Sequence, residues 1–422
     1  MWWTIQPPVD TYARLAYAGG MVESSTRVIL HLDLDAFFCA VEEQRDPALV
    51  GTTFAVGGQP ETRGVVASCS YAARRFGIHS AMPMARAVRQ CPGLIVVPPN
   101  FAAYRAASQQ VMARLRGMTP LVEQLSIDEA FLEVTSLSEP VELLAARLQD
   151  QIHDELGLSC SVGVATNKLV AKIATDAGKA AARAGHMPRA ICVVPPDQEA
   201  AFLAPLPTTA LWGVGEKTAE RLAALGIHTI GDLAAWPAED LAARFGQHGA
   251  DLARHARGRD DRPIVTERAS KSISQETTFG RDVRDAALLE HTLRDQAVTV
   301  AGKLRHKGLA GTAIKLKLRW PDFTTPTRQV TLPHPTDDAR TIAAAGLRLL
   351  HGLWPRGQPV RLIGIGISGL GALPRQLSLW DQPDPDETAR RQRVAEALAA
   401  VEARFGDGVV RRGSKLDEAE PA

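Results

Sequence analysis

The chain has 422 residues, of which 45% are hydrophobic and 23% charged, so it can build sizeable cores and is expected to form two to four domains. Its five cysteines fall singly, without a CxxC pair, so neither a zinc site nor a disulfide framework is indicated and a reducing compartment, the cytoplasm, is expected. No run is apolar for long enough to span a membrane, and the first twenty residues lack the apolar core of a signal peptide.

Charge is distributed unevenly, although the net charge is only +1. Residues 241–375 carry +10, whereas residues 1–240 carry −6 and residues 376–422 carry −3. A basic block of this size attracts a polyanion, and nucleic acid is the first candidate. A solvated basic surface is the alternative.

The pattern up to about residue 195 predicts an α+β domain behind an N-terminal extension, residues 1–25, to which no role is assigned. The apolar run 28–34 predicts a strand, and a helix follows from about Phe37. The next expected elements are a strand and two helices within 63–90, a helix at 104–119, a strand hairpin at 122–135, an amphipathic helix at 140–157, short strands at 159–166 and 191–196, and a helix at about 167–177 between them.

The remaining chain divides into three parts. Residues 198–257 are wholly helical in pattern, and the polar, aperiodic stretch "RGRDDRPIVTERASKS" is expected to be a linker. Residues 271–370 return to alternating strands and helices. A tail follows, with the apolar-aromatic cluster "QLSLW" and an amphipathic helical pattern after it.

Carboxylates interrupt two strands that otherwise appear buried. "LSIDEAFLEV" holds Asp128 and Glu129 without a Lys or Arg nearby in the sequence, and "VILHLDLDAFF" holds Asp33, with Asp35 on the same face by alternation. Burying a carboxylate without a partner costs several kcal/mol, roughly, so a bound cation is one explanation. A hairpin tip that leaves both acids in solvent is the other. Carboxylate oxygens suit Mg²⁺, and two such ions can support phosphoryl transfer.

Cationic side chains suited to a triphosphate occur in two further stretches. "SYAARRFG" offers Tyr71 and Arg74 on one helical face, and "TNKLVAKIATDAGK" offers Lys168, Lys172 and Lys179. Taken singly, each of these is more often a surface charge. Their combination with the two acidic strands favours a nucleotide site.

Six motifs, in this order, resemble those of Y-family DNA polymerases, and within them the bacterial DNA polymerase IV (DinB) type. They are "HLDLDAFFCAVEE", "ASCSYAARRFGIHSAMPMARA", "LSIDEAFLEV", "SVGVATNKLVAKIATD", "LWGVGEKTAERLAALGI" and "KSISQETTF". The resemblance implies a multidomain α+β fold shaped as a right hand. Its expected parts are the palm (26–36 and 98–195), the fingers (37–97), a helix-hairpin-helix thumb (196–258), a linker (259–270), an α/β little finger (271–373) and a tail (374–422).

The resemblance also implies roles for individual residues, with two Mg²⁺ ions, or Mn²⁺ as a substitute, as cofactor. The implied metal ligands and catalytic residues are Asp33, Asp128 and Glu129, with the backbone carbonyl of Leu34 as a further ligand and Asp35 in support. Phe37, Phe38, Ser68, Tyr71, Arg74 and Lys179 would bind the nucleotide. The Phe38 ring would be the steric gate that excludes a 2′-hydroxyl. This chain is several residues longer after Lys179 than the family pattern, so Lys172 is the alternative candidate for the lysine that contacts the triphosphate.

Two stretches are expected to hold DNA. In the thumb motif, Gly213 and Gly215 would let backbone N–H groups approach a phosphate beside Lys217. A tight turn between helices without any role in binding is the alternative explanation of these glycines. In "GTAIKLKLRW", alternation places Lys315, Lys317 and Arg319 on one face of a strand, which a solvated face would also explain. "GIGISG" imitates a dinucleotide-binding pattern but lacks the following helix, so it is predicted to be the last little-finger strand.

The tail peptide resembles the one by which bacterial polymerases bind the sliding clamp, with Gln376, Leu377, Leu379 and Trp380 as its contacts; an apolar patch that packs back on the protein is the alternative. The expected function is template-directed, translesion-type DNA synthesis by a monomer, of low fidelity and without proofreading, using primer-template DNA and deoxynucleoside triphosphates near the nucleoid. A non-catalytic, clamp-bound adaptor of the same fold and a nucleotidyl cyclase are the alternatives.

Overall fold

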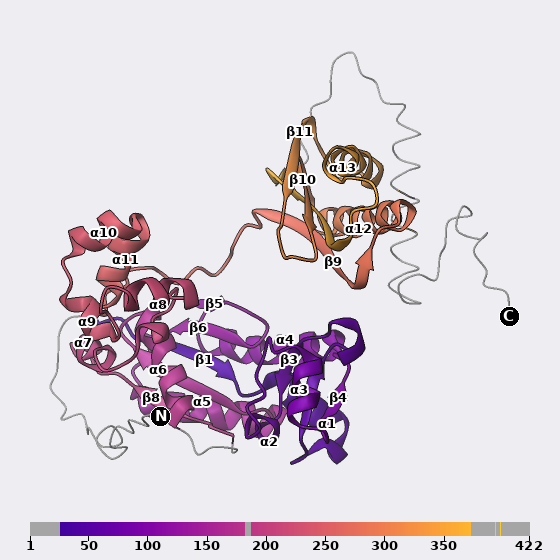
Figure 1. Cartoon of the computed structure of the whole chain (residues 1–422). Coiled ribbons are helices and arrows are strands. Elements are labelled where there is room, and N and C mark those ends of the chain that lie inside the picture. Colours follow the sequence, from indigo (N-terminus) through magenta and orange to yellow (C-terminus); the bar gives the residue numbers. More distant parts are fainter. Residues whose placement is uncertain (1–25, 182–186, 373–392, 394–396, 398–422) are drawn as a thin grey trace. The chain divides into compact units, whose positions relative to one another are not determined.

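The computed structural model describes residues 26–181 and 187–372 with two isolated later positions, 393 and 397. The described chain forms two compact units (Figure 1). One holds the residues up to Ala269 together with Thr278–Asp282, and the other holds Ser270–Thr277 and the residues from Val283 onward. No helix in these ranges is long and apolar enough to cross a membrane.

The first unit is organised around a five-stranded sheet in the order β5-β6-β1-β7-β8. Strand β1 is central and runs antiparallel to both of its neighbours, β6 and β7. The strands are β1 (Ile29–Leu34), β5 (Val122–Gln124), β6 (Glu129–Glu133), β7 (Cys160–Ala165) and β8 (Ile191–Val193). The hairpin and both short strands expected from the sequence are thus present.

Alternation along β1 divides the core of this unit between the two faces of the sheet. Leu30, Leu32 and Leu34 pack on one face with α1 (Phe37–Arg45), α4 (Phe101–Met118) and α5 (Val141–Leu156). Ile29 packs on the other face with α6 (Lys168–Ala181) and with the helices that follow the sheet. Asp33 shares this second face, so the helix α6 lies beside it.

Gly163 in β7 lets α6 approach the sheet closely. A Cβ atom at this position would lie 2.1 Å from the Ala171 carbonyl oxygen and 2.4 Å from the Thr175 nitrogen. Any side chain here would therefore push the helix away from the sheet. Helix α6 also extends four residues beyond the expected end at Ala177, which puts Lys179 on the helix.

A smaller three-stranded sheet, in the order β3-β2-β4, follows α1. Strand β2 pairs with β3 antiparallel and with β4 parallel, and α3 packs over the resulting core through the buried side chains Met84 and Ala87. The elements are β2 (Phe54–Gly57), β3 (Val66–Cys69), α2 (Tyr71–Arg74), α3 (Met84–Gln90) and β4 (Ile95–Val97).

The stretch expected to be wholly helical is helical in the structure. Its helices are α7 (Glu199–Leu203), α8 (Glu216–Ala223), α9 (Ile230–Ala235), α10 (Ala238–Phe245) and α11 (Gln247–His255). The polar stretch after α11 has no helix or strand up to Lys271, but its first half is held against the sheet domain. Asp260 accepts the Leu169 N–H at the start of α6, and Lys168 donates to the Pro263 carbonyl.

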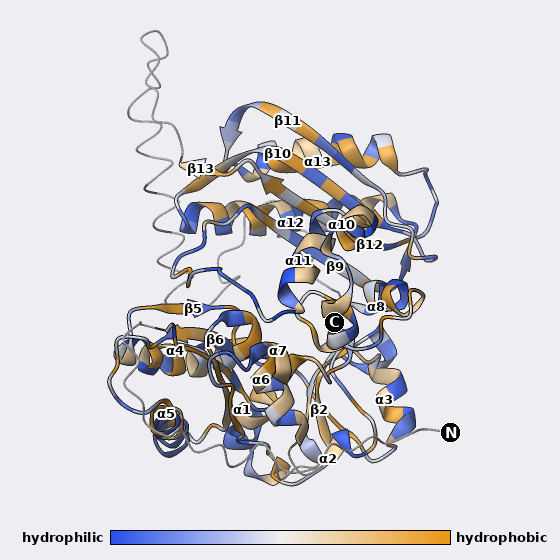
Figure 2. Cartoon of the chain, turned by 90° about the vertical axis from the view of Figure 1, so that its left-hand side faces the viewer, coloured by the Kyte–Doolittle hydropathy of each residue, from blue (hydrophilic) through white to orange (hydrophobic). Residues whose placement is uncertain are grey.

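The second unit is a sheet in the order β11-β10-β12-β9 with two helices on one face (Figure 1). Hydrophilic and hydrophobic residues alternate along its strands (Figure 2). The elements are β9 (Ser272–Val283), α12 (Ala286–His306), β10 (Leu309–Arg319), β11 (Thr327–Thr336), α13 (Ala339–Leu353) and β12 (Val360–Ser368). The "GIGISG" stretch begins within β12, as a strand, but it is not the last one, because β13 (Gly371–Ala372) follows and pairs with β10.

Candidate active site

The pairing register of β1 and β6 brings the acidic strands together. Asp33 lies directly opposite Glu129, and the Leu34 N–H donates to the Asp128 carbonyl at 2.9 Å. Side chains opposite each other in antiparallel strands project from the same face about 5 Å apart. The three candidate metal ligands therefore cluster at one end of the sheet.

Ser126 shapes the turn that presents Asp128 and Glu129. Its hydroxyl oxygen accepts both of their backbone N–H groups at 3.1 Å, and the hydroxyl donates to the Asp128 carboxylate. Such a turn holds successive residues through side-chain hydrogen bonds. The two acids are half-buried, so the solvent-exposed hairpin tip considered from the sequence is not what forms.

Helix α6 contributes three side chains along the face that meets these strands. Lys172 donates to Glu129 at 2.5 Å, Thr175 contacts the His31 ring at 2.9 Å, and Lys179 forms an ion pair with Asp33. Residues spaced by three and four share one helical face, which explains why all three reach the sheet. Lys168 is instead buried against Glu123 at 2.8 Å, away from this cluster.

The two opposed carboxylates have opposite electrostatic settings. Burial raises the pKa of Asp33 from 3.8 to about 6, and this outweighs the lowering effect of Lys179. The pKa of Glu129 is lowered from 4.5 to about 2, chiefly by the hydrogen bond from His31 and also by Lys172. The site thus favours a negative charge at Glu129 and disfavours it at Asp33.

Asp35 lies just beyond the end of β1 and is fully buried. Its carboxylate accepts hydrogen bonds from the hydroxyls of Ser159 and Ser161 at 2.8 and 2.9 Å and from the Arg189 N–H at 3.2 Å. Lys179 lies 3.4 Å from Asp35 as well as beside Asp33. Asp35 thereby helps to hold Lys179 beside Asp33, and this geometry suits the supporting role expected for Asp35.

The turn from β1 into α1 places two aromatic rings next to the acids. Ala36 has φ 45° and ψ 43°, a left-handed conformation that costs a non-glycine residue about 1 kcal/mol. The Phe38 ring stacks on the Tyr104 ring, with centroids 4.3 Å apart and planes 12° apart. Phe37 is buried beneath them, so the orientation of the exposed edge of Phe38 is fixed by packing.

A cavity of about 200 Å³ lies beside the carboxylates. Its polar lining combines acids and cations, and the Arg74 guanidinium stacks on the Tyr71 ring at 4.5 Å. Burial and the charges of Asp35 and Asp33 raise the pKa of Tyr71, so its hydroxyl stays protonated. The predicted site residues that line this cavity are Asp33, Leu34, Phe37, Phe38, Ser68, Tyr71, Arg74, Asp128 and Lys179.

These side chains suit hard divalent cations. In the described ranges, no three His, Cys, Asp or Glu side chains are arranged so that they could hold a metal ion by themselves, and Asp33 and Glu129 each pair with a lysine ammonium. A metal ion could take the place of the ammonium group beside each carboxylate. Mg²⁺ binds oxygen ligands such as carboxylates and backbone carbonyls, which this site provides. Burial raises the pKa of Asp33 and so disfavours its charged form, whereas a nearby divalent cation would favour that form.

The predicted DNA contacts lie on exposed backbone and side chains. Gly213 has φ +97°, Gly215 precedes the first residue of α8, and nothing lies within 4 Å of a Cβ built on either. The Lys217 side chain is exposed. The start of α8 is therefore exposed, as a contact between its backbone and a phosphate requires.

In β10, the alternation expected from the sequence is present. Ile314, Leu316 and Leu318 are fully buried, whereas the basic residues between them project from the opposite face. Lys317 is paired with Glu276 at 2.8 Å, and Arg319 donates to the Thr325 hydroxyl. Among the residues of known placement, no hydrogen bond or ion pair engages the exposed Lys315 side chain. The clamp-contact candidates Gln376, Leu377, Leu379 and Trp380 lie outside the described residues.

Several residues of the site were not identified from the sequence. His31, Ser126 and Tyr104 each contact a candidate site residue directly. His31 did carry a signal, since it interrupts the apolar run "VILHL" two residues before Asp33. Tyr104 carried none, because an aromatic residue on a helix is ordinarily a core residue.

Three family models match the chain. The impB/mucB/samB family matches residues 32–176, the C-terminal domain of the impB/mucB/samB family matches 270–379, and the thumb domain of DNA polymerase-iota matches 209–260. Together these segments cover the three candidate metal ligands, the helices α8 to α11 and the second unit as far as β13, whereas Lys179 and α7 fall between the matches at 32–176 and 209–260.

Curated relatives agree with these models. A protein named DNA polymerase IV from Dehalococcoides mccartyi (strain CBDB1) is 39% identical over 92% of this chain and 97% of its own length. Another of the same name, from Halorhodospira halophila, is 42% identical over 84% of this chain and 98% of its own length.

Solved structures resemble the fold. A Y-family DNA polymerase chimera, Dbh-Dpo4(243-245)-Dbh, matches with TM-score 0.72 and 25% identity over 82% of this chain and 99% of that one. DinB from Sulfolobus solfataricus matches with TM-score 0.55 and 26% identity over the same shares. An insertion ternary complex of Dbh DNA polymerase matches with TM-score 0.58 and 26% identity, again over 82% and 99%. The chain therefore belongs to the Y family of DNA polymerases, beside the proteins named DNA polymerase IV, and the expectation of a DNA-directed DNA polymerase with palm, fingers, thumb and little finger is confirmed.

Proposed function

We propose that this polymerase extends a primer by two-metal-ion nucleotidyl transfer, with Mg²⁺ held by Asp33, Asp128, Glu129 and the Leu34 carbonyl. The observation that carries the proposal is the β1–β6 register, which sets Glu129 opposite Asp33; Asp33 and Asp128 line the cavity, and Glu129 does not. When bound, Mg²⁺ would lower the pKa of the primer 3′-hydroxyl and neutralise charge on the transferring phosphates. Mn²⁺ would serve as a substitute.

Lys172 and Lys179 would exchange partners as substrate binds. Without metal, their ammonium groups neutralise Glu129 and Asp33. With a divalent cation on those carboxylates, Lys179 would be free to turn to the triphosphate, next to Arg74 and Tyr71. Charge-assisted hydrogen bonds from these donors would orient the β and γ phosphates. The proton of the primer hydroxyl would leave to water, because no side chain of this cavity is a convincing general base.

Phe38 would act as the steric gate. Its ring lines the cavity and stacks on Tyr104, so it cannot easily turn aside for a 2′-hydroxyl. A deoxyribose would pack against the ring, whereas a ribose would clash with it. Phe37 and Ser68 would complete the wall around the nucleotide.

Primer-template DNA would be held by the thumb turn and by the basic face of β10, through phosphates and without reading sequence. The Dbh structure named an insertion ternary complex supports the expectation that members of this family bind their substrates in such a fold. We further propose synthesis past damaged bases, at low fidelity and without proofreading, by a monomer in the cytoplasm near the nucleoid. The tail peptide at Gln376–Trp380 would bind the sliding clamp.

Primer extension with purified protein tests the catalytic assignment. Asp128→Asn and Glu129→Gln should each lower the extension rate by at least about 100-fold. The matched control is Asp154→Asn, because Asp154 is an exposed carboxylate on α5. Primer-template affinity should persist in all three variants, since the proposed DNA contacts are elsewhere. Extension at the wild-type rate by Glu129→Gln would refute the metal assignment, and a wild type unable to extend any primer would favour the non-catalytic adaptor.

A further inference from the structure

His31 is a buried polar residue inside the sheet that carries the acids. Its side chain is 0% exposed, and its ring lies against Phe131 of the neighbouring strand, with centroids 4.8 Å apart. An apolar residue would fill this position without the cost of burying two ring nitrogens. The ring nitrogens therefore need partners, and both have them.

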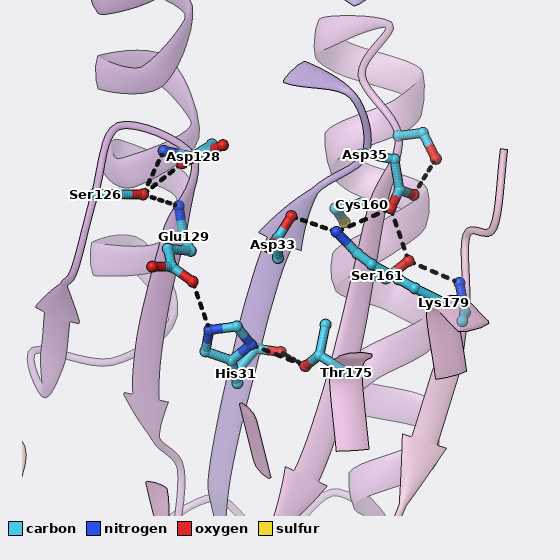
Figure 3. Close-up of polar contacts among 12 residues, drawn as sticks. His31, Asp33, Asp35, Ser126, Asp128, Glu129, Cys160, Ser161, Thr175 and Lys179 are labelled. Carbon is cyan, nitrogen blue, oxygen red and sulfur yellow. Dashed lines mark hydrogen bonds and ion pairs between the residues drawn. The ribbon is translucent and has the colours of Figure 1, made fainter. Parts of the chain in front are cut away.

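The two partners of the ring lie on opposite sides of it (Figure 3). Nε2 lies 3.2 Å from Oε2 of Glu129, and Nδ1 lies 2.9 Å from the Thr175 hydroxyl oxygen. A carboxylate can only accept, so the hydrogen of the neutral ring belongs on Nε2. Nδ1 is then an acceptor, and the Thr175 hydroxyl is the donor nearest to it, although the backbone carbonyls of His31 and Ala171, each at 3.1 Å, compete for the same hydrogen. When the hydroxyl hydrogen is directed at Nδ1, Thr175 favours the tautomer in which His31 donates to Glu129.

The ring and Lys172 converge on the same oxygen of Glu129. Lys172 lies 2.5 Å from Oε2, the atom that His31 also contacts. In the described part of the chain, no hydrogen bond or ion pair reaches Oε1. Two donors on one oxygen fix the rotation of the carboxylate and leave the other oxygen available.

We propose that His31 is a positioning residue for Glu129: its Nε2–H, held in that tautomer by Thr175, orients the carboxylate so that Oε1 can bind a divalent cation. This inference rests on the proposed function, because it assumes that Glu129 is a metal ligand. Groups that hydrogen-bond to a metal ligand typically change metal affinity or activity by 10- to 100-fold, approximately, when they are removed. In the proposed exchange of partners Lys172 would leave Glu129, whereas His31 is enclosed and would stay in place.

Four variants separate positioning from packing. His31→Phe keeps a ring against Phe131 but removes the donor, and His31→Gln restores an N–H donor at a similar reach. Thr175→Val removes the hydroxyl while keeping the branched shape, and Thr175→Ser retains the hydroxyl. The full-length chain is used throughout, with thermal unfolding and primer-template affinity measured for each variant.

The main readout is Mn²⁺ binding, followed by the loss of the free Mn²⁺ signal in electron paramagnetic resonance, with primer-template and a non-hydrolysable deoxynucleoside triphosphate present. His31→Phe should weaken Mn²⁺ binding by about 10-fold. It should raise the Mg²⁺ concentration for half-maximal extension similarly, with a smaller change in the rate at saturating Mg²⁺. His31→Gln should recover most of the loss. Thr175→Val should weaken binding less than His31→Phe, and Thr175→Ser should match wild type.

Equal Mn²⁺ affinity in wild type and His31→Phe would overturn the inference, as would a His31→Gln variant no better than His31→Phe. If His31→Phe does not fold, Thr175→Val carries the test, and wild-type affinity in that variant would overturn it. Glu129→Gln distinguishes the two levels of the proposal. If it binds Mn²⁺ as tightly as wild type does, the metal assignment itself is wrong, whatever the His31 variants do.

Discussion

The cations of the candidate active site and those of strand β10 are used in different ways. In the active site, Lys172 and Lys179 are largely buried and are directed at particular carboxylates, Lys172 at Glu129 and Lys179 at Asp33 and Asp35. On β10, the basic residues recur at every second position on an open face, above a row of fully buried aliphatic side chains. The first arrangement is set by a helix face meeting two strands, and the second by strand alternation alone.

This difference predicts two kinds of response to mutation. A buried cation aimed at one acid depends on a particular geometry, so a single substitution should change one property strongly. An exposed row of cations acts on a polyanion through total charge, so each member should contribute a modest and similar amount. The substitutions below compare single changes among the packed side chains of the active site with changes along the exposed row of cations on β10.

The largest expected effect is on sugar selection at Phe38. Phe38→Ala removes the ring that lines the cavity, so incorporation of ribonucleotides relative to deoxynucleotides should rise by about 10- to 200-fold, the range for one misfitting group against an apolar side chain. The measurement is kcat/KM for both nucleotide types in single-nucleotide extension. Phe101→Ala is the matched control, because Phe101 contacts Phe38 edge-on yet does not line the cavity. If discrimination stays unchanged in Phe38→Ala, another residue must be the gate.

A smaller, graded effect is expected on β10. Changing Lys315, Lys317 and Arg319 together to alanine should reduce the salt dependence of DNA binding, lowering the log–log slope by about 2 to 3. Among single changes, Lys315→Ala should weaken binding more than Lys317→Ala, because Glu276 already neutralises Lys317. Binding isotherms from low to moderate salt measure both quantities.

The control for this series removes the same number of charges from the helices of the second unit. Arg294, Arg340 and Arg348 are exposed on α12 and α13, so their triple alanine variant should leave the slope nearly unchanged. A slope that falls equally in both triple variants would mean that overall charge, and not the β10 face, governs binding.

Much of this contrast was accessible from the sequence, because it depends on short-range periodicity. Alternation in "AIKLKLRW" predicted which β10 residues are buried, and the apolar runs around Asp33 and Glu129 predicted two strands. The spacing of Lys172 and Lys179 is also a helical one. These patterns indicate which face of each helix or strand is buried, and such faces pack against one another in the folded protein.

The parts that could not be predicted depend on register and on close approach. Nothing local states that Asp33 faces Glu129, because a shift of one residue would turn one of them to the other face. Gly163 appeared to be an ordinary strand residue, yet its missing side chain is what lets α6 reach the sheet. The left-handed Ala36 gave no signal either, since alanine rarely adopts that conformation.

The smallest expected effect lies within the active site, where the two opposed acids should respond in opposite directions when the protein is free of divalent ions. The pKa of Asp33 is raised from 3.8 to about 6, so its charged form destabilises the fold at neutral pH. The pKa of Glu129 is lowered to about 2, so its charge stabilises the fold. Asp33→Asn should therefore increase the free energy of unfolding by about 1 to 3 kcal/mol at pH 7.5, and Glu129→Gln should decrease it by a similar amount.

The free energies of unfolding of the two variants, each compared with wild type, should depend on pH in different ways. As pH falls through 6, folded wild type takes up a proton at Asp33 before the unfolded chain does. The gain in free energy of unfolding of Asp33→Asn over wild type therefore decreases and is nearly gone by about pH 4. The loss in free energy of unfolding caused by Glu129→Gln should stay constant down to pH 4.5, the ordinary pKa of a glutamate, and should shrink only below that pH. Urea unfolding in a chelator at pH 7.5 and pH 5 separates the two, because only the Asp33→Asn difference should change. Lys179 keeps Asp35 as a partner in Asp33→Asn, so loss of its ion pair should not mask the gain. A destabilised Asp33→Asn at pH 7.5 would mean that the Lys179 ion pair outweighs the cost of burying the Asp33 charge.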